Sequence, residues 1–312
     1  MKVTITGATG FIGRALCREL LKEGHEVVAL TRDTVRAVSI LGADVKCVVW
    51  GSKRDDWMRE VAGSDAVIHL AGESVAGGRW TPEFKRKLID SRVETIRSLF
   101  EAFRIEASHP PVFLYASGIH YYGDGGEQTI TENSPRGSGF LAELSSVLDD
   151  EIAKASSLQM RVVSLRIGIV LGANGGALEK MLYPLPVHVS PWKLGLGGPL
   201  GNGKQWFAWI HLDDVVGLFL WALTNTRVVG AVNAVAPQTI RNSEFSKALG
   251  RAMNRPSLFP VPGFVLKAMI GDFASDLLTG QKAVPSVAER LGYQFKYAYV
   301  SKALFAILKE QK

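Results

Sequence analysis

The sequence predicts an α/β fold in which a doubly wound parallel sheet carries a smaller C-terminal lobe. Three observations predict it. Short apolar runs alternate with amphipathic stretches, a glycine-rich turn follows the first run, and glycine and proline interrupt the second half of the chain. Because strand–helix–strand repeats join parallel strands by right-handed crossovers, helices should cover both faces of the sheet, as in Rossmann-type folds.

The apolar runs are short and bounded by turn residues, which is typical of buried strands. Six of them lie before residue 166, and a seventh follows in the later half of the chain. They span residues 2–6, 26–31, 45–50, 66–70, 112–116, 161–165 and 230–236.

Amphipathic segments at residues 14–22, 82–103 and 215–223 predict helices between these strands. In residues 82–103 the apolar positions recur at helical spacing, with charged residues on the other side. Thr81 before Pro82 predicts the start of this helix, because a capping hydroxyl precedes a proline that has no N–H to leave unpaired.

The later half of the chain is less regular. Residues 172–204 and 256–263 are rich in glycine and proline, and a helical tail closes the chain. We expect a main domain from residues 1–171 and 205–236, and a smaller lobe from residues 172–204 and 237–312. The lobe should lie over the carboxyl ends of the strands, where open α/β sheets bind ligands, so that the two parts enclose a cleft.

Composition excludes several classes of protein. The 312 residues hold no apolar run of the roughly 18 needed to span a bilayer, and the chain enters a strand without a signal sequence. We therefore expect a cytoplasmic protein with no membrane partner. The two cysteines, Cys17 and Cys47, predict no disulfide framework and no metal site, and are interpreted as core residues. The net charge of +6 is spread along the chain, which favours a phosphate-bearing small molecule over nucleic acid.

Residues 7–13 read Gly-Ala-Thr-Gly-Phe-Ile-Gly, directly after a predicted strand and at the start of a helix. In that context the glycines allow a tight turn, a close approach of backbone to a pyrophosphate, and close packing of helix on strand. The N–H groups at the helix start face the phosphates with partial positive charge. The motif therefore predicts a bound dinucleotide.

The end of the second predicted strand indicates which dinucleotide binds. NAD enzymes usually place a carboxylate there for the ribose hydroxyls, but this chain has Thr31 followed by Arg32. A guanidinium beside a small hydroxyl suits the 2′-phosphate of NADP, which a carboxylate would repel. Asp33 is the alternative ribose ligand, one residue too late. His69, in the apolar fourth run, is interpreted as a core histidine rather than a catalyst.

These motifs and later ones resemble an extended short-chain dehydrogenase/reductase, and more narrowly its epimerase-like branch with a C-terminal domain of unknown function. Members of this branch are labelled sugar-nucleotide epimerases or cell-division-inhibitor homologues. The matching motifs lie along nearly the whole chain, at residues 6–13, 70–73, 79–81, 91–92, 121–123, 166–172, 194–203, 209–214, 233–237 and 277–282. The resemblance implies cofactor contacts from Gly7, Gly10, Phe11, Ile12, Gly13, Thr31, Arg32, Leu70, Ala71, Arg92 and the backbone around Val170.

The catalytic residues depart from the family pattern. Extended short-chain enzymes use a Ser or Thr after the fifth strand and a Tyr-x-x-x-Lys motif, whose lysine lowers the tyrosine pKa for proton transfer. The positions of that tyrosine and lysine hold Phe140 and Leu144, which cannot exchange a proton. The candidate catalytic residues are Ser117, Tyr121 and Tyr122, although a gapless comparison puts Gly118 at the usual serine position. Further polar candidates are His120, Glu143, Lys193 and His211.

Two functions therefore stay open. The first is an NADP(H)-dependent oxidoreductase or epimerase that acts on a small polar substrate, such as a sugar nucleotide, with a non-standard proton donor. The second is a catalytically weak or inactive NADPH-binding regulatory or scaffold protein, linked to division only by analogy with the labels of the family. The sequence leaves open whether the chain forms a homo-oligomer.

Overall fold

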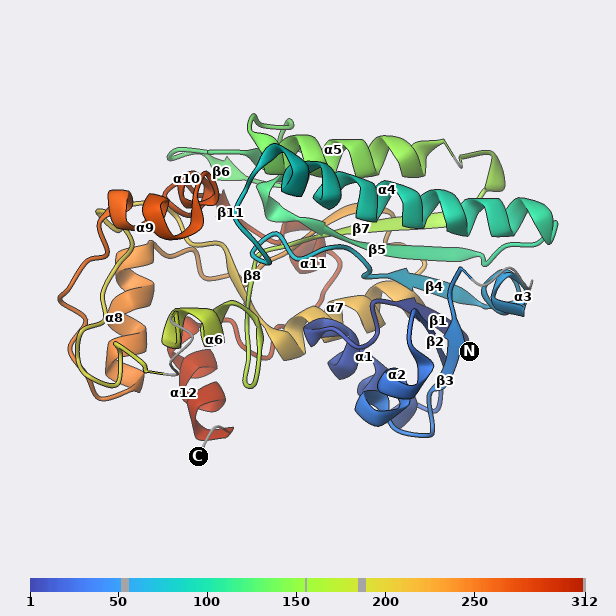
Figure 1. Cartoon of the computed structure of the whole chain (residues 1–312), viewed down its shortest axis with the longest axis horizontal. Coiled ribbons are helices and arrows are strands. Elements are labelled where there is room, and N and C mark those ends of the chain that lie inside the picture. The colour runs from blue at the N-terminus through green and yellow to red at the C-terminus, as the bar shows by residue number, and fades with distance from the viewer. Residues whose placement is uncertain (52–55, 155, 185–188, 311–312) are drawn as a thin grey trace.

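The predicted parallel sheet is confirmed by the computed structural model, which describes residues 1–51, 56–154, 156–184 and 189–310. Seven parallel strands form one sheet in the order β10-β7-β5-β4-β1-β2-β3 (Figure 1). The strand order reverses direction at β1, so the sheet is doubly wound. The strands are β1 (Lys2–Thr6), β2 (Glu26–Thr31), β3 (Lys46–Val49), β4 (Ala66–His69), β5 (Val112–Gly118), β7 (Arg161–Ile167) and β10 (Gly230–Ala234).

β1 and β2 match the predicted runs, whereas the other strands differ at their ends. β3 is one residue shorter than its run at each end, and β4 ends one residue early, at His69. β5 and β7 continue to Gly118 and Ile167, because backbone pairing goes on beyond the apolar runs and places Ser117 opposite Arg166. β10 ends before Ala236, because the N–H of Ala236 donates to a carbonyl of β9 (Trp209–His211) at 2.7 Å. The apolar pattern therefore located each strand but not its last residues.

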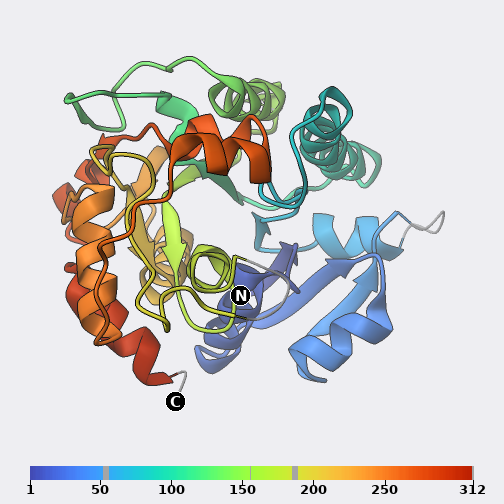
Figure 2. The same ribbon diagram turned by 60° about the vertical axis from the view of Figure 1, so that its left-hand side comes forward.

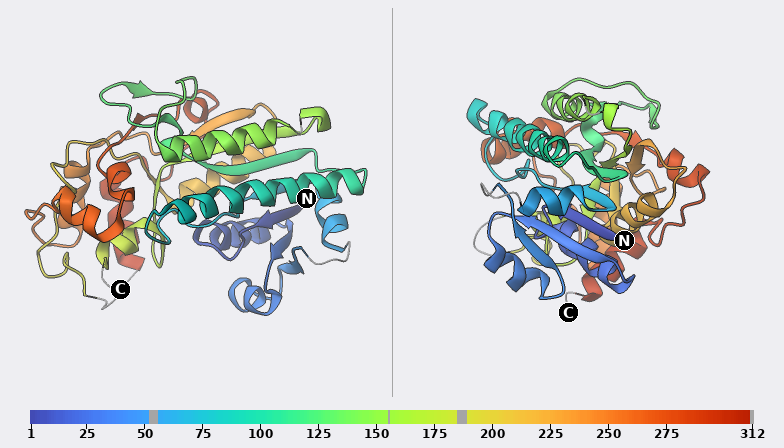
Figure 3. Two further views of the ribbon diagram at one scale, coloured as in Figure 1. Left: turned by 45° about the horizontal axis from the view of Figure 1, so that its top comes forward. Right: turned by 90° about the vertical axis from the view of Figure 1, so that its right-hand side faces the viewer.

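Helices cover both faces of the sheet (Figure 3). Side chains of β5 alternate between the two faces, since Leu114 joins one apolar core while Phe113 and Tyr115 join the other. One face carries α1 (Phe11–Lys22), α2 (Thr34–Leu41) and α7 (Leu212–Thr224), and the other carries α3 (Asp56–Ala62), α4 (Pro82–Ile105) and α5 (Phe140–Ala153).

The helix starts follow local capping. Thr81 Oγ1 accepts a hydrogen bond from the N–H of Phe84 at 3.2 Å with Pro82 in the first turn, as predicted for α4. α1 begins at Phe11, earlier than the predicted residue 14, because Gly10 of the glycine motif is itself the N-cap. α7 begins at Leu212 rather than at residue 215, because the side chain of His211 caps its first turn.

The later part of the chain lies next to the carboxyl ends of the strands (Figure 2) and has an apolar core of its own, besides the two on the faces of the sheet. β8 (Ile169–Leu171) pairs with β9, and the core between them and the helices includes Trp209, Phe245 and Leu304. The helices here are α6 (Gly176–Leu182), α8 (Asn242–Ala252), α9 (Gly263–Ile270), α10 (Phe273–Leu277) and α12 (Val300–Glu310). Residues 185–188 of the predicted lobe lie outside the described residues.

Short elements connect this part to the main sheet. β6 (Thr129–Ile130) pairs with β11 (Lys282–Ala283), and α11 (Ser286–Arg290) packs Ala288 into the core beside β10. Two 3₁₀ turns, η1 (Ile119–Tyr122) and η2 (Ser156–Leu158), follow β5 and α5. Across the described ranges, every helix is too short or too polar to cross a membrane.

Candidate functional site

The turn from β1 to α1 brings the predicted glycines together. Gly7 has a φ of +70°, and a Cβ there would lie 2.8 Å from the carbonyl carbon of Leu70, the residue after β4. A Cβ on Gly13 would come within 2.6 Å of the carbonyl oxygen of Ala8. Gly7 and Gly13 are therefore required by the fold itself.

Gly10 differs from its two neighbours in the motif. A Cβ on Gly10 would approach only the Gly7 carbonyl oxygen, at 3.1 Å, and its own N–H donates to that oxygen at 3.0 Å. It caps a helix of 12 residues whose first turn holds no acidic side chain. The N–H groups of that first turn have no partners within a helix, so they are suited to bind an anion.

Thr6 holds the end of β4 beside this turn, a role that sequence reasoning missed. Its hydroxyl accepts hydrogen bonds from the N–H groups of Leu70 and Ala71 at 3.2 and 3.1 Å. It also bonds Nδ1 of His69 at 2.8 Å, while Nε2 of that ring lies 3.4 Å from Thr95 Oγ1. His69 is buried, and burial lowers its pKa to about 3. The interpretation of His69 as a core histidine is therefore confirmed.

The end of β2 separates the roles of Arg32 and Asp33. The carboxylate of Asp33 accepts a hydrogen bond from the N–H of Arg36 at 3.0 Å and so caps α2. The N–H of Asp33 donates to Thr31 Oγ1 at 3.2 Å. Arg32 is exposed. Asp33, the alternative ribose ligand, is thus the N-cap of α2. Its place in the sequence, just before the first residue of that helix, is typical of a capping aspartate.

The remaining predicted cofactor residues lie around the same turn. Arg92 of α4 packs on Gly72, and Nη1 donates to the Leu88 carbonyl at 3.0 Å. Burial lowers the pKa of Arg92. On the other side, the ring of Phe11 packs against three glycines, where an added Cβ would lie within 2.8 Å of the ring. Those glycines are Gly172, Gly175 and Gly176, and they follow Val170 of β8. Ile12 packs partly buried against the core.

The two predicted catalytic tyrosines lie differently. The hydroxyl of Tyr122 donates to Asn233 Oδ1 at 2.8 Å and accepts from Nη1 of Arg166 at 2.7 Å, and the ring is 3% exposed. Burial raises the pKa of Tyr122. Tyr121 is partly exposed, and its ring lies over the guanidinium of Arg166 with 3.5 Å from Cζ to the ring centroid. Tyr122 is therefore held in a buried network, whereas Tyr121 reaches the surface.

Arg166 is the centre of that network and was not among the predicted site residues. Register places Arg166 of β7 opposite Ser117 of β5 and opposite Asn233 of β10, in one row near the carboxyl ends of the strands. Its guanidinium also faces Asp149 at 3.6 Å. Ser117 Oγ is buried and has no hydrogen-bond partner among the described residues. The signal in the sequence was a lone arginine inside a buried strand, which requires partners.

Phe140 and Leu144, the residues expected at the positions of the tyrosine and lysine, belong to an apolar cluster on the same side of the sheet as Arg166. Leu144 is 6% exposed and packs with Leu88 and Trp80. The ring of Trp80 lies between two phenylalanines, with its centroid 5.1 Å from that of Phe140 and 5.0 Å from that of Phe273. The side chains here have no proton to exchange, so another group must supply any proton transfer.

The other polar candidates do not gather at one point. His211 is the cap of α7, its ring lies beside that of Tyr297 with centroids 3.9 Å apart, and its pKa is lowered to about 4 chiefly by burial. His211 is therefore part of the start of α7. Burial also lowers the pKa of His120 to about 4. Glu143 is exposed on α5, and Lys193 lies on the second lobe with its Nζ 5.4 Å from the centroid of the Tyr183 ring.

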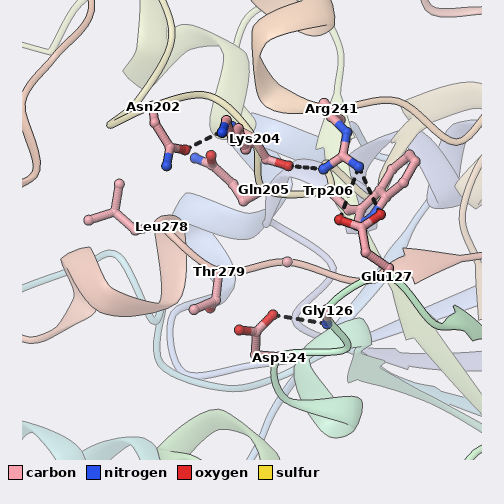
Figure 4. A pocket seen from close by; sticks show the side chains of 11 residues that line it. Asp124, Gly126, Glu127, Asn202, Lys204, Gln205, Trp206, Arg241, Leu278 and Thr279 are labelled. Atoms are coloured by element: carbon pink, nitrogen blue, oxygen red, sulfur yellow. Dashed lines mark hydrogen bonds and ion pairs between the residues drawn. The ribbon is translucent and has the colours of Figure 1, made fainter.

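A pocket of about 490 Å³ lies elsewhere, between the loop after η1, the loop before β9, the start of α8 and the end of α10 (Figure 4). Nη2 of Arg241 donates to both carboxylate oxygens of Glu127, at 2.8 and 3.0 Å, and its Cζ lies 4.3 Å from the centroid of a ring of Trp206. None of the predicted cofactor or catalytic residues lines this pocket. Within the described ranges, no group of three His, Cys, Asp or Glu residues is placed to hold a metal ion.

Comparison with known proteins agrees with this architecture. The chain matches the model of the NAD dependent epimerase/dehydratase family over residues 3–235 and a domain of unknown function, DUF1731, over residues 261–307. It is 40% identical over 311 residues to "Epimerase family protein SDR39U1 homolog, chloroplastic" of Arabidopsis thaliana, covering 99% of this chain and 87% of that one. It is 36% identical over 314 residues to "Epimerase family protein SDR39U1" of Mus musculus, covering 97% and 98%.

A solved structure extends the likeness to three dimensions. The crystal structure of the human epimerase family protein SDR39U1 with NADPH has a TM-score of 0.85 and 33% identity, with 99% of each chain covered. The resemblance that the motifs predicted is thereby confirmed. The chain belongs to the NAD dependent epimerase/dehydratase family, in the group that carries a C-terminal DUF1731 domain.

Proposed function

We propose that this protein binds NADP(H) at the start of α1 and acts on a small polar substrate, either reducing it with NADPH or epimerising it by transient hydride transfer to and from NADP⁺. The observation that carries the cofactor assignment is at the end of β2, where Asp33 caps α2 and leaves exposed Arg32 beside Thr31 for a 2′-phosphate. The residues fit a dinucleotide, because Gly10 leaves space beside the N–H groups of a helix start. The relative crystallised with NADPH supports the same choice.

The cofactor assignment predicts the effect of Arg32→Ala. Loss of a charge-assisted hydrogen bond, worth about 1.5–3 kcal/mol, should lower the preference for NADPH over NADH by about 10- to 150-fold. Isothermal titration of both cofactors measures this ratio. Arg18→Ala, at an exposed position further along α1, is the matched control and should keep the wild-type ratio. Equal affinity of the wild-type protein for NADPH and NADH would rule the assignment out.

For the chemical step we assign proton transfer to Tyr121. Its partial exposure beside the carboxyl ends of β5 and β7 supports this role, whereas the hydroxyl of Tyr122 already bonds Arg166 and Asn233. Ser117, whose hydroxyl has no partner among the described residues, is assigned the hydrogen bond to the reacting oxygen.

Turnover of NADPH with a panel of carbonyl compounds tests this step. Tyr121→Phe should lower the rate about 10²- to 10⁴-fold, the usual contribution of general acid–base catalysis. Tyr122→Phe is the control: it should weaken the fold, because Arg166 loses a partner, but keep the rate of the folded fraction within a few-fold. Wild-type turnover in the Tyr121→Phe variant would show that another group carries out the proton transfer.

The apolar cluster around Trp80 favours a second candidate function. Leu144 and Phe140 occupy the dyad positions within packed apolar surroundings, so the protein could hold NADPH without catalysis and act as a regulatory or scaffold protein. The same assay separates the two candidates. Tight NADPH binding with no turnover on any carbonyl compound would support the second.

A further inference from the structure

The loop between β4 and α4, residues 70–81, begins next to the start of α1. Its first residues lie against Gly7, since a Cβ on that glycine would sit 2.8 Å from the Leu70 backbone. Ser91 of α4 accepts a hydrogen bond from the N–H of Glu73 at 3.1 Å. This β4–α4 loop therefore forms one side of the proposed cofactor site.

The middle of the β4–α4 loop is joined to α6. Nζ of Lys180 donates a hydrogen bond to the Ala76 carbonyl at 3.0 Å, across 104 positions of sequence. α6 directly follows the glycines on which the ring of Phe11 packs. The β4–α4 loop lies against Gly7, and the segment that leads into α6 lies against Phe11. Lys180 thus connects the two segments that flank the start of α1.

The end of the β4–α4 loop is fixed much more firmly. Trp80 is 6% exposed, and its ring lies between Phe140 of α5 and Phe273 of α10. Its Nε1 donates to the Val75 carbonyl at 2.8 Å. Phe273 belongs to the DUF1731 region, residues 261–307. The C-terminal domain therefore anchors this loop beside the main sheet.

The two attachments differ in strength. The Trp80 anchor packs a buried ring against two partly buried phenylalanine rings, and such aromatic packing stabilises a contact strongly. The bond between Lys180 and Ala76 is exposed to solvent, where a single hydrogen bond contributes little and opens readily. Val75, just before Ala76, is held by Trp80, but Gly77 and Gly78 between Ala76 and Trp80 are exposed, which gives this stretch of backbone freedom to move.

We propose that the β4–α4 loop is a strap over the start of α1, with Trp80 as its fixed end and Lys180 as a latch that sets the rates of NADPH association and release. This inference rests on the proposed binding of NADPH. Because the latch joins the two segments that flank the start of α1, it must open both when the cofactor binds and when it leaves. Lys180 is a positioning residue in this proposal, because it acts through the loop.

Stopped-flow measurement of NADPH association and release tests the latch. Lys180→Ala should raise both rates by about 3- to 10-fold and leave the dissociation constant within about 2-fold, because the barrier falls for both directions. Lys180→Arg, which keeps a donor on a long side chain, should restore most of the slow kinetics. Lys247→Ala, at an exposed position on α8, is the matched control and should behave as wild type.

Hydrogen exchange provides a readout that needs no cofactor. The amides of residues 73–79 should exchange about 3- to 10-fold faster in Lys180→Ala than in the wild-type protein, with the core strands unchanged. Unchanged NADPH rates in Lys180→Ala would overturn the latch while leaving NADPH binding intact. A faster release with unchanged association would instead make Lys180 a direct cofactor ligand and overturn the strap. If the wild-type protein bound no NADPH, the proposed function itself would be wrong.

Discussion

Replacing Gly10 with valine is expected to raise the dissociation constant for NADPH by at least about 100-fold while the chain stays folded. The valine side chain would occupy the space beside the first N–H groups of α1. Two charge-assisted hydrogen bonds to the pyrophosphate, worth about 1.5–3 kcal/mol each, would be lost. Within the protein, a Cβ on Gly10 approaches only one atom, the Gly7 carbonyl oxygen at 3.1 Å. Calorimetric titration with NADPH measures the effect.

A matched variant separates this effect from strain in the fold. A Cβ on Gly63, at the end of α3, would also lie 3.1 Å from a backbone carbonyl oxygen, that of Arg59. Gly63→Val should therefore keep wild-type affinity, and both variants should melt within about 4 °C of wild type. Gly13→Val should fail to fold, since its Cβ would lie 2.6 Å from the Ala8 carbonyl oxygen. Normal NADPH affinity in Gly10→Val would show that the motif is structural only.

Leu144→Lys, a step towards restoring the missing dyad, should instead cost about 3–5 kcal/mol of unfolding free energy. Leu144 is 6% exposed among apolar side chains, so an introduced ammonium would lose its hydration without gaining a partner. Lys85 already places its Nζ 5.6 Å from the centroid of a Trp80 ring, and a second cation would be repelled by it. Equilibrium denaturation measures the loss.

The dependence on pH identifies the cause of that loss. The unfolded chain would bind a proton at the introduced lysine more readily than the folded one, so the stability of the variant should rise relative to wild type towards about pH 10. Leu144→Met, which keeps volume and carries no charge, should stay within about 1.5 kcal/mol of wild type at every pH. Wild-type stability of Leu144→Lys would mean that the Trp80 cluster opens to solvent.

Much of the cofactor site could be predicted because its chemistry is local. The glycine motif determines its own turn, since Gly7 needs a φ of +70° and Gly10 caps the helix that follows at once. Thr31 and Arg32 come directly after a strand, so their place in the fold also follows from neighbours in sequence. The sequence analysis named Asp33 only as the alternative ribose ligand, and its role as the cap of α2 came from the structure.

The polar network at the strand ends could not be predicted in the same way. Arg166 meets Tyr122, Asp149 and Asn233 only because the strand order places β7 between β5 and β10. Tyr121 and Tyr122 are adjacent in sequence, yet one ring is partly exposed and the other buried. That difference comes from the direction of each side chain in η1, which no pattern in the sequence distinguishes.

The sequence by itself determined the doubly wound sheet and the glycine motif at the start of α1, because strand periodicity and glycine geometry are properties of short segments. Only the tertiary structure decided what surrounds Phe140 and Leu144, the residues expected at the positions of the tyrosine and lysine. Trp80 and Phe273 meet there with Phe140 from positions far apart in the chain, and stacking between them depends on how the C-terminal domain packs on α4 and α5. Long-range packing of this kind is set by the shape of the whole core.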